Sequence, residues 1–228
     1  MLAEINGKIS KTGRNLNDRL EDELTGNILG TLRYIPFSEG LQPILQNSVF
    51  PSSIQEIVKQ IQSDEWSSKI RFWPYDNEGE LDAYLEFDDV AIGIEVKYHS
   101  GLSSDDGADY SDIDNIENET ENSSHQLQRE TRIVSRKGVG KQKLLLLIAD
   151  AMSCADVYAN VQKRKLLSKT DVAFGYISWQ SFLKELHSIK LNNHFYRVII
   201  NDLIDVSSQV KPADFRHKPY NFLRIRNR

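Results

Sequence analysis

The segment from Glu80 to Tyr98 reads ELDAYLEFDDVAIGIEVKY, and the alternation of residues on either side of Asp88 and Asp89 predicts a β-hairpin. A two-residue turn at these aspartates, or a four-residue loop from Phe87 to Val90, gives the same strand pairing. One face then carries only apolar pairs: Phe87–Val90, Leu85–Ile92, Ala83–Ile94 and Leu81–Val96. Because a slip of one residue would mix apolar and polar side chains, this pattern fixes the register.

The other face of the predicted hairpin is crowded with charge. Its pairs are Glu86–Ala91, Tyr84–Gly93, Asp82–Glu95 and Glu80–Lys97. Directly opposed Cβ atoms lie about 4.5–5.5 Å apart, a distance at which like charges are destabilising. Asp82 and Glu95 must therefore share a proton, splay into solvent or share a cation. Mg²⁺ is a cation that one or two carboxylates commonly hold.

Two neighbours of this carboxylate pair bear on the choice. Lys97 lies two residues beyond Glu95 and points to the same face, where it can reach a water or a phosphate oxygen at a metal. Gly93 leaves room beside the carboxylates for a ligand or a backbone segment. The alternative is a solvated polar face on which Glu80 and Lys97 form a surface ion pair.

A third carboxylate lies on a predicted helix over residues 16–35. Glu21 falls on the apolar stripe of that helix, in line with Leu24, Ile28 and Leu32. A carboxylate on a core-facing stripe is costly unless it is paired or bound to a metal. The alternative is that Glu21 begins the helix, where the helix dipole favours negative charge.

The rest of the chain alternates helices and strands. We expect helices over 54–62, 123–138, 153–167, 180–189 and 194–208, and strands over 69–75, 141–150 and 171–179. Ser123 or Ser124 is the candidate N-cap of the helix over 123–138. Residues 36–53, with three prolines, are expected to form a connection. Strands alternating with helices after a hairpin predict an α/β domain around a mixed sheet.

Charge is unevenly distributed along what we interpret as one domain over 1–228. The segment from Tyr98 to Ser124 holds eight acidic residues and no Lys or Arg, so the remainder has a net charge of +3. This segment predicts an acidic mobile loop over about 100–123. We expect a core over about 14–179 and a helical C-terminal extension over about 180–228, in which a helix from Phe195 to Val206 is suited to dimerisation.

Several classes of protein find no support in the sequence. The single cysteine, Cys154, cannot form an intramolecular disulfide and is expected to be a small core residue. Neither a signal peptide nor an apolar run of membrane length is evident, which favours the cytoplasm. The stretch RKGVGKQK departs from the phosphate-binding loop pattern, and the five histidines show no zinc-ligand spacing.

The charged motif resembles that of the PD-(D/E)xK nuclease superfamily, which includes restriction endonucleases. The resemblance rests on Asp82, on Glu95-Val96-Lys97 after the hairpin, and on a glutamate in the preceding helix. The stretch EDELTGNILGTLRYIP (21–36) is similar to the N-terminal helix of restriction-like members, and HQLQRE (125–130) carries the Gln-Leu pair that many members have after the third strand. The chain departs from the pattern where Leu81 replaces the proline, and in its long acidic loop.

The resemblance implies a restriction endonuclease-like three-layer core, in which helices flank a central mixed β-sheet. It also implies a metal-dependent DNA endonuclease of prokaryotic defence or DNA processing. The residues that would coordinate Mg²⁺, or Mn²⁺ in its place, are Asp82, Glu95, Val96 through its carbonyl, and Glu21. Lys97 would orient or help deprotonate the attacking water, and Gln126 would position Lys97 or a backbone phosphate.

Two alternatives keep the fold and change the function. The long acidic loop would repel phosphate, which motivates a nuclease-fold subunit or sensor that binds nucleic acid or a protein partner without cutting. An RNA endonuclease would use the same site as a DNA endonuclease. The expected partners are therefore DNA or RNA, together with a second copy of the chain or a protein of a defence complex.

Overall fold

The computed structural model describes residues 2–6, 8, 16–97, 116–165, 167 and 169–209. The helices are α1 (Leu2–Ile5), α2 (Leu16–Leu32), η1 (Phe37–Glu39), α3 (Leu41–Gln46), α4 (Ser52–Gln60), α5 (Trp66–Lys69), α6 (Ile116–Lys137), α7 (Ala151–Arg164), α8 (Trp179–Ser188) and α9 (His194–Gln209). The strands are β1 (Ile70–Phe72), β2 (Tyr75–Asp76), β3 (Gly79–Glu80), β4 (Ala83–Glu86), β5 (Val90–Val96), β6 (Gln142–Ala149) and β7 (Val172–Ser178).

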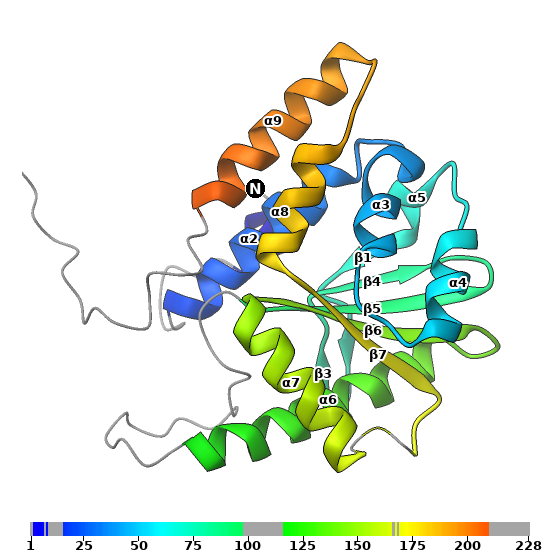
Figure 1. Cartoon of the computed structure of the whole chain (residues 1–228), viewed down its shortest axis with the longest axis vertical. Helices are drawn as coiled ribbons and strands as arrows, with labels where there is room; N and C mark the ends of the chain where they lie inside the picture. Colours follow the sequence, from blue (N-terminus) through cyan, green and yellow to red (C-terminus); the bar gives the residue numbers. More distant parts are fainter. Residues whose placement is uncertain are drawn as a thin grey trace, which may run out of the picture.

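A five-stranded mixed sheet lies at the centre of the fold, in the order β1-β4-β5-β6-β7. The pairs β1–β4 and β4–β5 are antiparallel, whereas β5–β6 and β6–β7 are parallel. Helices lie on both faces of the sheet, with α6 and α7 on one side and α2, α3, α8 and α9 on the other (Figure 1). The predicted α/β class with a mixed sheet is therefore confirmed.

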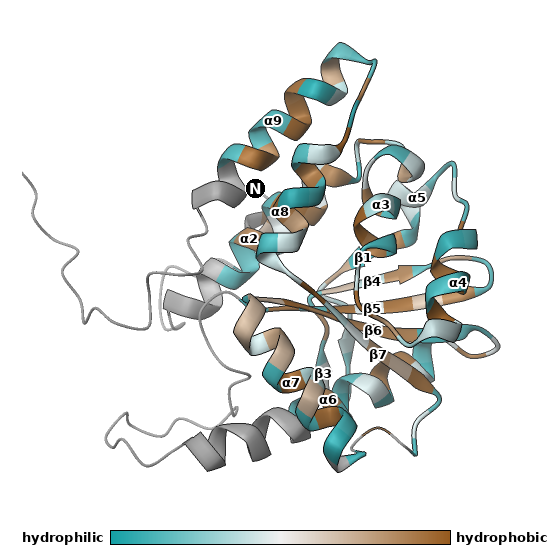
Figure 2. Ribbon diagram, viewed as in Figure 1, coloured by the Kyte–Doolittle hydropathy of each residue, from teal (hydrophilic) through white to brown (hydrophobic). Residues whose placement is uncertain are grey.

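The apolar residues of the strands separate into two buried clusters, one against each helical layer. Ala83, Leu85, Ile92 and Ile94 pack with α2, α3 and α8. Tyr84 and Ala91 alternate with them and pack with α6 and α7. Figure 2 shows the corresponding concentration of hydrophobic residues along the central strands. Burial of both faces explains the nearly continuous apolar run of β6.

The register predicted for the hairpin is confirmed in the half next to the turn. Ala83 pairs with Ile94 and Leu85 with Ile92, and the Phe87 N–H donates to the Val90 carbonyl at 2.8 Å to close the turn. Strand β4 begins only at Ala83, however. The three predicted pairs farthest from the turn are therefore wrong: Asp82–Glu95, Leu81–Val96 and Glu80–Lys97.

The chain departs from the predicted ladder because it turns aside to form the small β2–β3 hairpin. Glu80 pairs with Tyr75 in that hairpin and forms an ion pair with Lys8 rather than with Lys97. Leu81 packs in the cluster under α6 rather than with Ala83. Trp73 has a φ of 48° and its N–H donates to the Asp82 carbonyl at 3.1 Å, which marks the point of departure.

Around Tyr84 and Glu95 the polar face of the hairpin is not solvated. Tyr84 has no exposed surface and Glu95 is 3% exposed, because α6 covers this face. A Cβ atom added at Gly93 would lie 2.4 Å from Val134 Cγ2. The room beside Gly93 is thus taken by a side chain of α6 rather than by a ligand or a backbone segment.

The helix that carries the predicted Gln-Leu pair is longer than expected. It begins at Ile116 rather than at Ser123 or Ser124, so the predicted loop is helical from Ile116 onward. Residues 98–115, which include most of the acidic segment, and the basic segment 210–228 lie outside the described residues.

Other predictions are confirmed or corrected locally. The proline-rich connection 36–53 contains η1 and α3 and is not purely irregular. Cys154 is buried, and burial of its thiol raises the pKa to about 12. RKGVGKQK links α6 to β6, as expected of a connection. Within the described residues, no helix combines the length and the apolar character that crossing a membrane requires.

Candidate active site

The predicted site residues meet at the carboxyl end of β5, beside the parallel strand β6 (Figure 1). Asp82 precedes β4, Glu95 and Val96 end β5, and Lys97 follows it. Glu21 comes from α2 in one helical layer, and Gln126 comes from α6 in the other. Ligands of α/β proteins commonly bind at the carboxyl ends of parallel strands. The site therefore combines both layers at a location typical of binding.

Lys97 connects the two glutamates of the site. Its Nζ lies 2.8 Å from Glu95 Oε1 and 3.5 Å from Glu21 Oε2. The three side chains retain only 11%, 4% and 10% of their exposure, respectively. Glu21 is thus buried. Helix α2 begins at Leu16, five residues before Glu21, which excludes the alternative that Glu21 begins the helix.

The backbone of Lys97 is held as firmly as its side chain. Its N–H donates to the Ile148 carbonyl at 2.8 Å, which extends the pairing of β5 with β6. Its carbonyl accepts from the indole Nε1 of Trp179 at 2.9 Å. Trp179 is 4% exposed, so a buried indole anchors this end of the site.

Asp82 lies against the same strand end. Its Oδ2 accepts from the backbone N–H of Val96 at 2.7 Å. Burial and the nearby Glu95 carboxylate raise the pKa of Asp82 well above its usual range, although Lys97 and the Val96 N–H act in the opposite direction. The two acids predicted to oppose one another do interact, even though the strand ladder does not pair them.

The electrostatics of Lys97 favour its charged form. Burial alone would lower the pKa of the ammonium, but the carboxylates of Glu95, Glu21 and Asp82 outweigh it, so the pKa is raised well above its ordinary value. A lysine in this state donates hydrogen bonds and supplies positive charge. Of its two predicted roles, orienting water fits this state better than removing a proton.

Gln126 reaches the same carboxylate oxygen as Lys97. Its Nε2 donates to Glu95 Oε1 at 2.7 Å. Gln126 and Lys97 thus both donate to one oxygen of Glu95, and the positioning role of Gln126 stays a prediction.

Glu130 is the site residue that the sequence reasoning missed. It lies one turn beyond Gln126 on α6 and is 3% exposed. Burial raises the pKa of its carboxyl group, Glu95 and Asp82 add to the rise, and Lys97 and Gln126 oppose it. The sequence did contain a signal for Glu130. Its helical spacing places it on the same face as Leu127 and Val134, which are buried, so its carboxylate lies on a core-facing stripe like that of Glu21.

The donor set matches a hard divalent cation in chemistry. Carboxylate oxygens and a backbone carbonyl are the ligands that Mg²⁺ takes. Burial, and after it the neighbouring carboxylates, raise the pKa of Asp82 and of Glu130, so the charged form of each acid is disfavoured in the absence of a cation. In the described part of the chain, however, no three His, Cys, Asp or Glu side chains converge in an arrangement that could hold a metal ion. Instead, the Lys97 ammonium contacts one oxygen of Glu95 and one of Glu21, and the Val96 N–H donates to one oxygen of Asp82.

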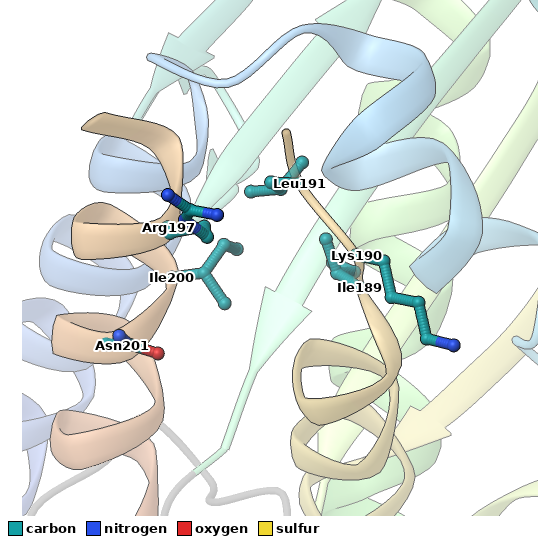
Figure 3. Close-up of a pocket in the computed structure, with 6 residues that line it drawn as sticks. All are labelled: Ile189, Lys190, Leu191, Arg197, Ile200 and Asn201. Atoms are coloured by element: carbon teal, nitrogen blue, oxygen red, sulfur yellow. The ribbon is translucent and has the colours of Figure 1, made fainter. Parts of the chain in front are cut away.

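A separate cavity of about 300 Å³ lies where the connection after α8 meets α9. Its described lining residues are Ile189, Lys190, Leu191, Arg197, Ile200 and Asn201. Figure 3 shows the Lys190 side chain extending away from the others. The lining includes none of the predicted site residues, so this cavity has no part in the candidate site.

No family model, curated protein or solved structure matches this chain. The resemblance to the PD-(D/E)xK superfamily therefore stays a prediction. Assignment of a function depends on the chemistry of the residues gathered at the end of β5.

Proposed function

We propose that this chain is a metal-dependent endonuclease of restriction endonuclease-like fold that hydrolyses phosphodiester bonds in DNA. One observation carries the proposal: Glu95 and Lys97 at the end of β5 form a buried contact of 2.8 Å, with Asp82 and Glu21 beside it. Buried charges are rarely retained without a partner or a task. Ion-pair networks with strongly perturbed pKa values are common at catalytic sites.

The order of the elements supports the proposed fold. A helix (α2), an antiparallel hairpin (β4–β5), a helix (α6), a parallel strand (β6), a helix (α7) and a second parallel strand (β7) follow one another. This is the order that the resemblance implies for the nuclease core. The predicted Gln-Leu pair also lies on the helix that covers the site.

Each residue has a task in the proposed reaction. Asp82, Glu95, the Val96 carbonyl and Glu21 would hold Mg²⁺ or Mn²⁺. The metal ion, when bound, would lower the pKa of a water and offset charge on the phosphate. Lys97 stays protonated, so it donates to a phosphate oxygen and stabilises the negative charge that develops there. Gln126 holds Glu95 in place.

The test is a cleavage assay on the full chain with plasmid, single-stranded DNA and RNA. We expect cleavage of DNA that requires Mg²⁺ or Mn²⁺ and stops with a chelator. Glu95→Gln should lower the rate by about 10³-fold, the loss typical of removing one key electrostatic contact. Glu56→Gln, at an exposed ion pair, is the matched control. Equal activity of Glu95→Gln and wild type would remove the site assignment, and stronger cleavage of RNA would change the substrate.

A specific observation favours a second candidate, a non-cleaving subunit that binds nucleic acid or a protein partner. Lys97 already contacts Glu95 and Glu21, and the Val96 N–H already contacts Asp82, so protein groups neutralise part of the cluster. Stable nucleic-acid binding without cleavage would favour this reading. Tight Mn²⁺ binding that is lost in Asp82→Asn would argue against it.

A further inference from the structure

Two buried oxygen atoms on α6 lack a hydrogen-bond donor among the described residues: Gln126 Oε1 and Glu130 Oε2. Leaving a buried polar atom unpartnered is costly. The orientation of the Gln126 amide therefore needs a cause strong enough to leave its oxygen without a donor.

The amide nitrogen of Gln126 accounts for that orientation. It donates to Glu95 Oε1 at 2.7 Å, and a reversed amide would place its oxygen against the Glu95 carboxylate. Glu130 is four residues further along the helix, so it is a neighbour of Gln126 on the same face. The Gln126 side chain is also near Glu130, and this proximity lowers the pKa of the Glu130 carboxyl group against the larger effect of its burial. An amide nitrogen carries two hydrogens, one for each of the two acidic groups.

We propose that Glu130 is a positioning residue for the candidate active site: together with Glu95 it holds the Gln126 amide with its nitrogen toward both carboxyl groups, and so fixes Glu95. The contact acts beyond α6, because Gln126 and Lys97 donate to the same oxygen of Glu95. Any movement of the amide alters the contact between Glu95 and Lys97. The catalytic consequence rests on the proposed nuclease function, whereas the contact itself does not.

The test follows the two side-chain amide hydrogens of Gln126 by NMR in the metal-free protein, with Gln126→Met to assign them. In the wild type we expect both hydrogens to exchange with solvent more slowly than those of Gln180, which is exposed. Slowing of only one hydrogen would overturn the proposal, and this measurement needs no change at Glu130.

Two variants at Glu130 distinguish the effect of losing the acceptor oxygen from the effect of changing the side-chain volume. Glu130→Met keeps a similar volume without an acceptor, and we expect one hydrogen of Gln126 to exchange about tenfold faster, as for loss of a hydrogen bond to a charged group. Glu130→Gln keeps an acceptor oxygen and should retain the slow exchange. Unchanged exchange in Glu130→Met would overturn the proposal, as would equal acceleration in both variants.

A parallel cleavage assay distinguishes this proposal from the proposed function. If the protein cleaves DNA, we expect Glu130→Met to lower kcat about tenfold and to leave KM unchanged, while Glu130→Gln restores the rate. If the protein does not cleave but the exchange pattern is as expected, the nuclease proposal fails and the positioning role of Glu130 stands.

Discussion

Strand β5 runs from an apolar half, Val90 to Ile94, into a charged end at Glu95 and Lys97. Both regions are buried: Ile92 and Ile94 have no exposed surface, while Glu95 retains 3% and Lys97 9%. The apolar half is stabilised by removal of its side chains from water. The charged end incurs a desolvation penalty that only its internal contacts offset.

The difference shows that burial alone does not identify a core. The apolar half faces α2 and α8 on one side of the sheet and α6 on the other, and each apolar residue there is stabilised by its own removal from water. At the charged end every group depends on its neighbours, since Lys97 contacts Glu95 and Glu21, and Gln126 contacts Glu95. We therefore expect single changes in the two regions to behave differently.

Removal of the Lys97 charge is the strongest test of this contrast. Lys97→Met should lower the free energy of unfolding by about 3–5 kcal/mol at pH 7, because it leaves buried carboxylates without their cation. The raised pKa of Lys97 means that its stabilising charge is present throughout the pH range below its ordinary value. The measurement is urea denaturation at several pH values.

The pH dependence distinguishes loss of charge from loss of packing. As the pH falls through the raised pKa values of Asp82 and Glu130, these groups become neutral and need no cation. The cost of Lys97→Met should therefore shrink toward acid pH. Ile92→Val in the apolar half, which should cost about 0.5–1.5 kcal/mol, should show no such trend. A constant cost of Lys97→Met would mean that the contrast between the regions is wrong.

A substitution at Gly93, within the apolar half, tests steric fit. Gly93→Ala should lower the free energy of unfolding by about 1–3 kcal/mol, because the new Cβ would overlap Val134 Cγ2. Urea denaturation of this variant, of Val134→Ala and of the double variant forms a double-mutant cycle. We expect the second change to recover much of the loss caused by the first. Additive losses would show that α6 does not limit the space beside Gly93.

Local pattern was enough to predict the apolar half, and the register of Ala83 to Glu86 with Ala91 to Ile94 is as expected. It also predicted Asp82, Glu95 and Lys97 on one face of the hairpin, whereas Gln126 and the grouping of Glu21 with these residues came from the resemblance to the nuclease superfamily; the structure brings the five residues together. Alternation succeeds here because each apolar side chain favours the same register on its own. The same reasoning identified Glu21, since a carboxylate on an apolar stripe is visible from spacing.

The errors arise where contacts distant in sequence decide the path of the chain. The β2–β3 hairpin, which delays the start of β4 to Ala83, is held to α6 by ion pairs of Arg136 with Asp76 and Glu78, and of Arg132 with Glu78. No local pattern around residue 80 reports these partners. Glu130 is a different kind of miss, because its helical spacing was evident and was not used.

The last effect we predict has the opposite sign and concerns Glu130. Because its pKa is raised, the folded protein holds more protons at this residue than the unfolded chain above about pH 4.3, the ordinary pKa of glutamate. The free energy of unfolding therefore falls as the pH rises toward the folded-state pKa. Glu130→Gln removes this contribution, so the variant should become more stable than the wild type as the pH rises.

The measurement compares the pH dependence of unfolding in Glu130→Gln with that of the wild type and of Glu56→Gln, a control at an exposed glutamate. The two glutamine variants should diverge as the pH rises, with the buried one gaining relative to the wild type. Parallel curves for all three proteins would mean that burial does not penalise the Glu130 charge. The charged end of β5 would then accept a carboxylate as readily as water does, and the distinction from the apolar half would rest on Lys97 alone.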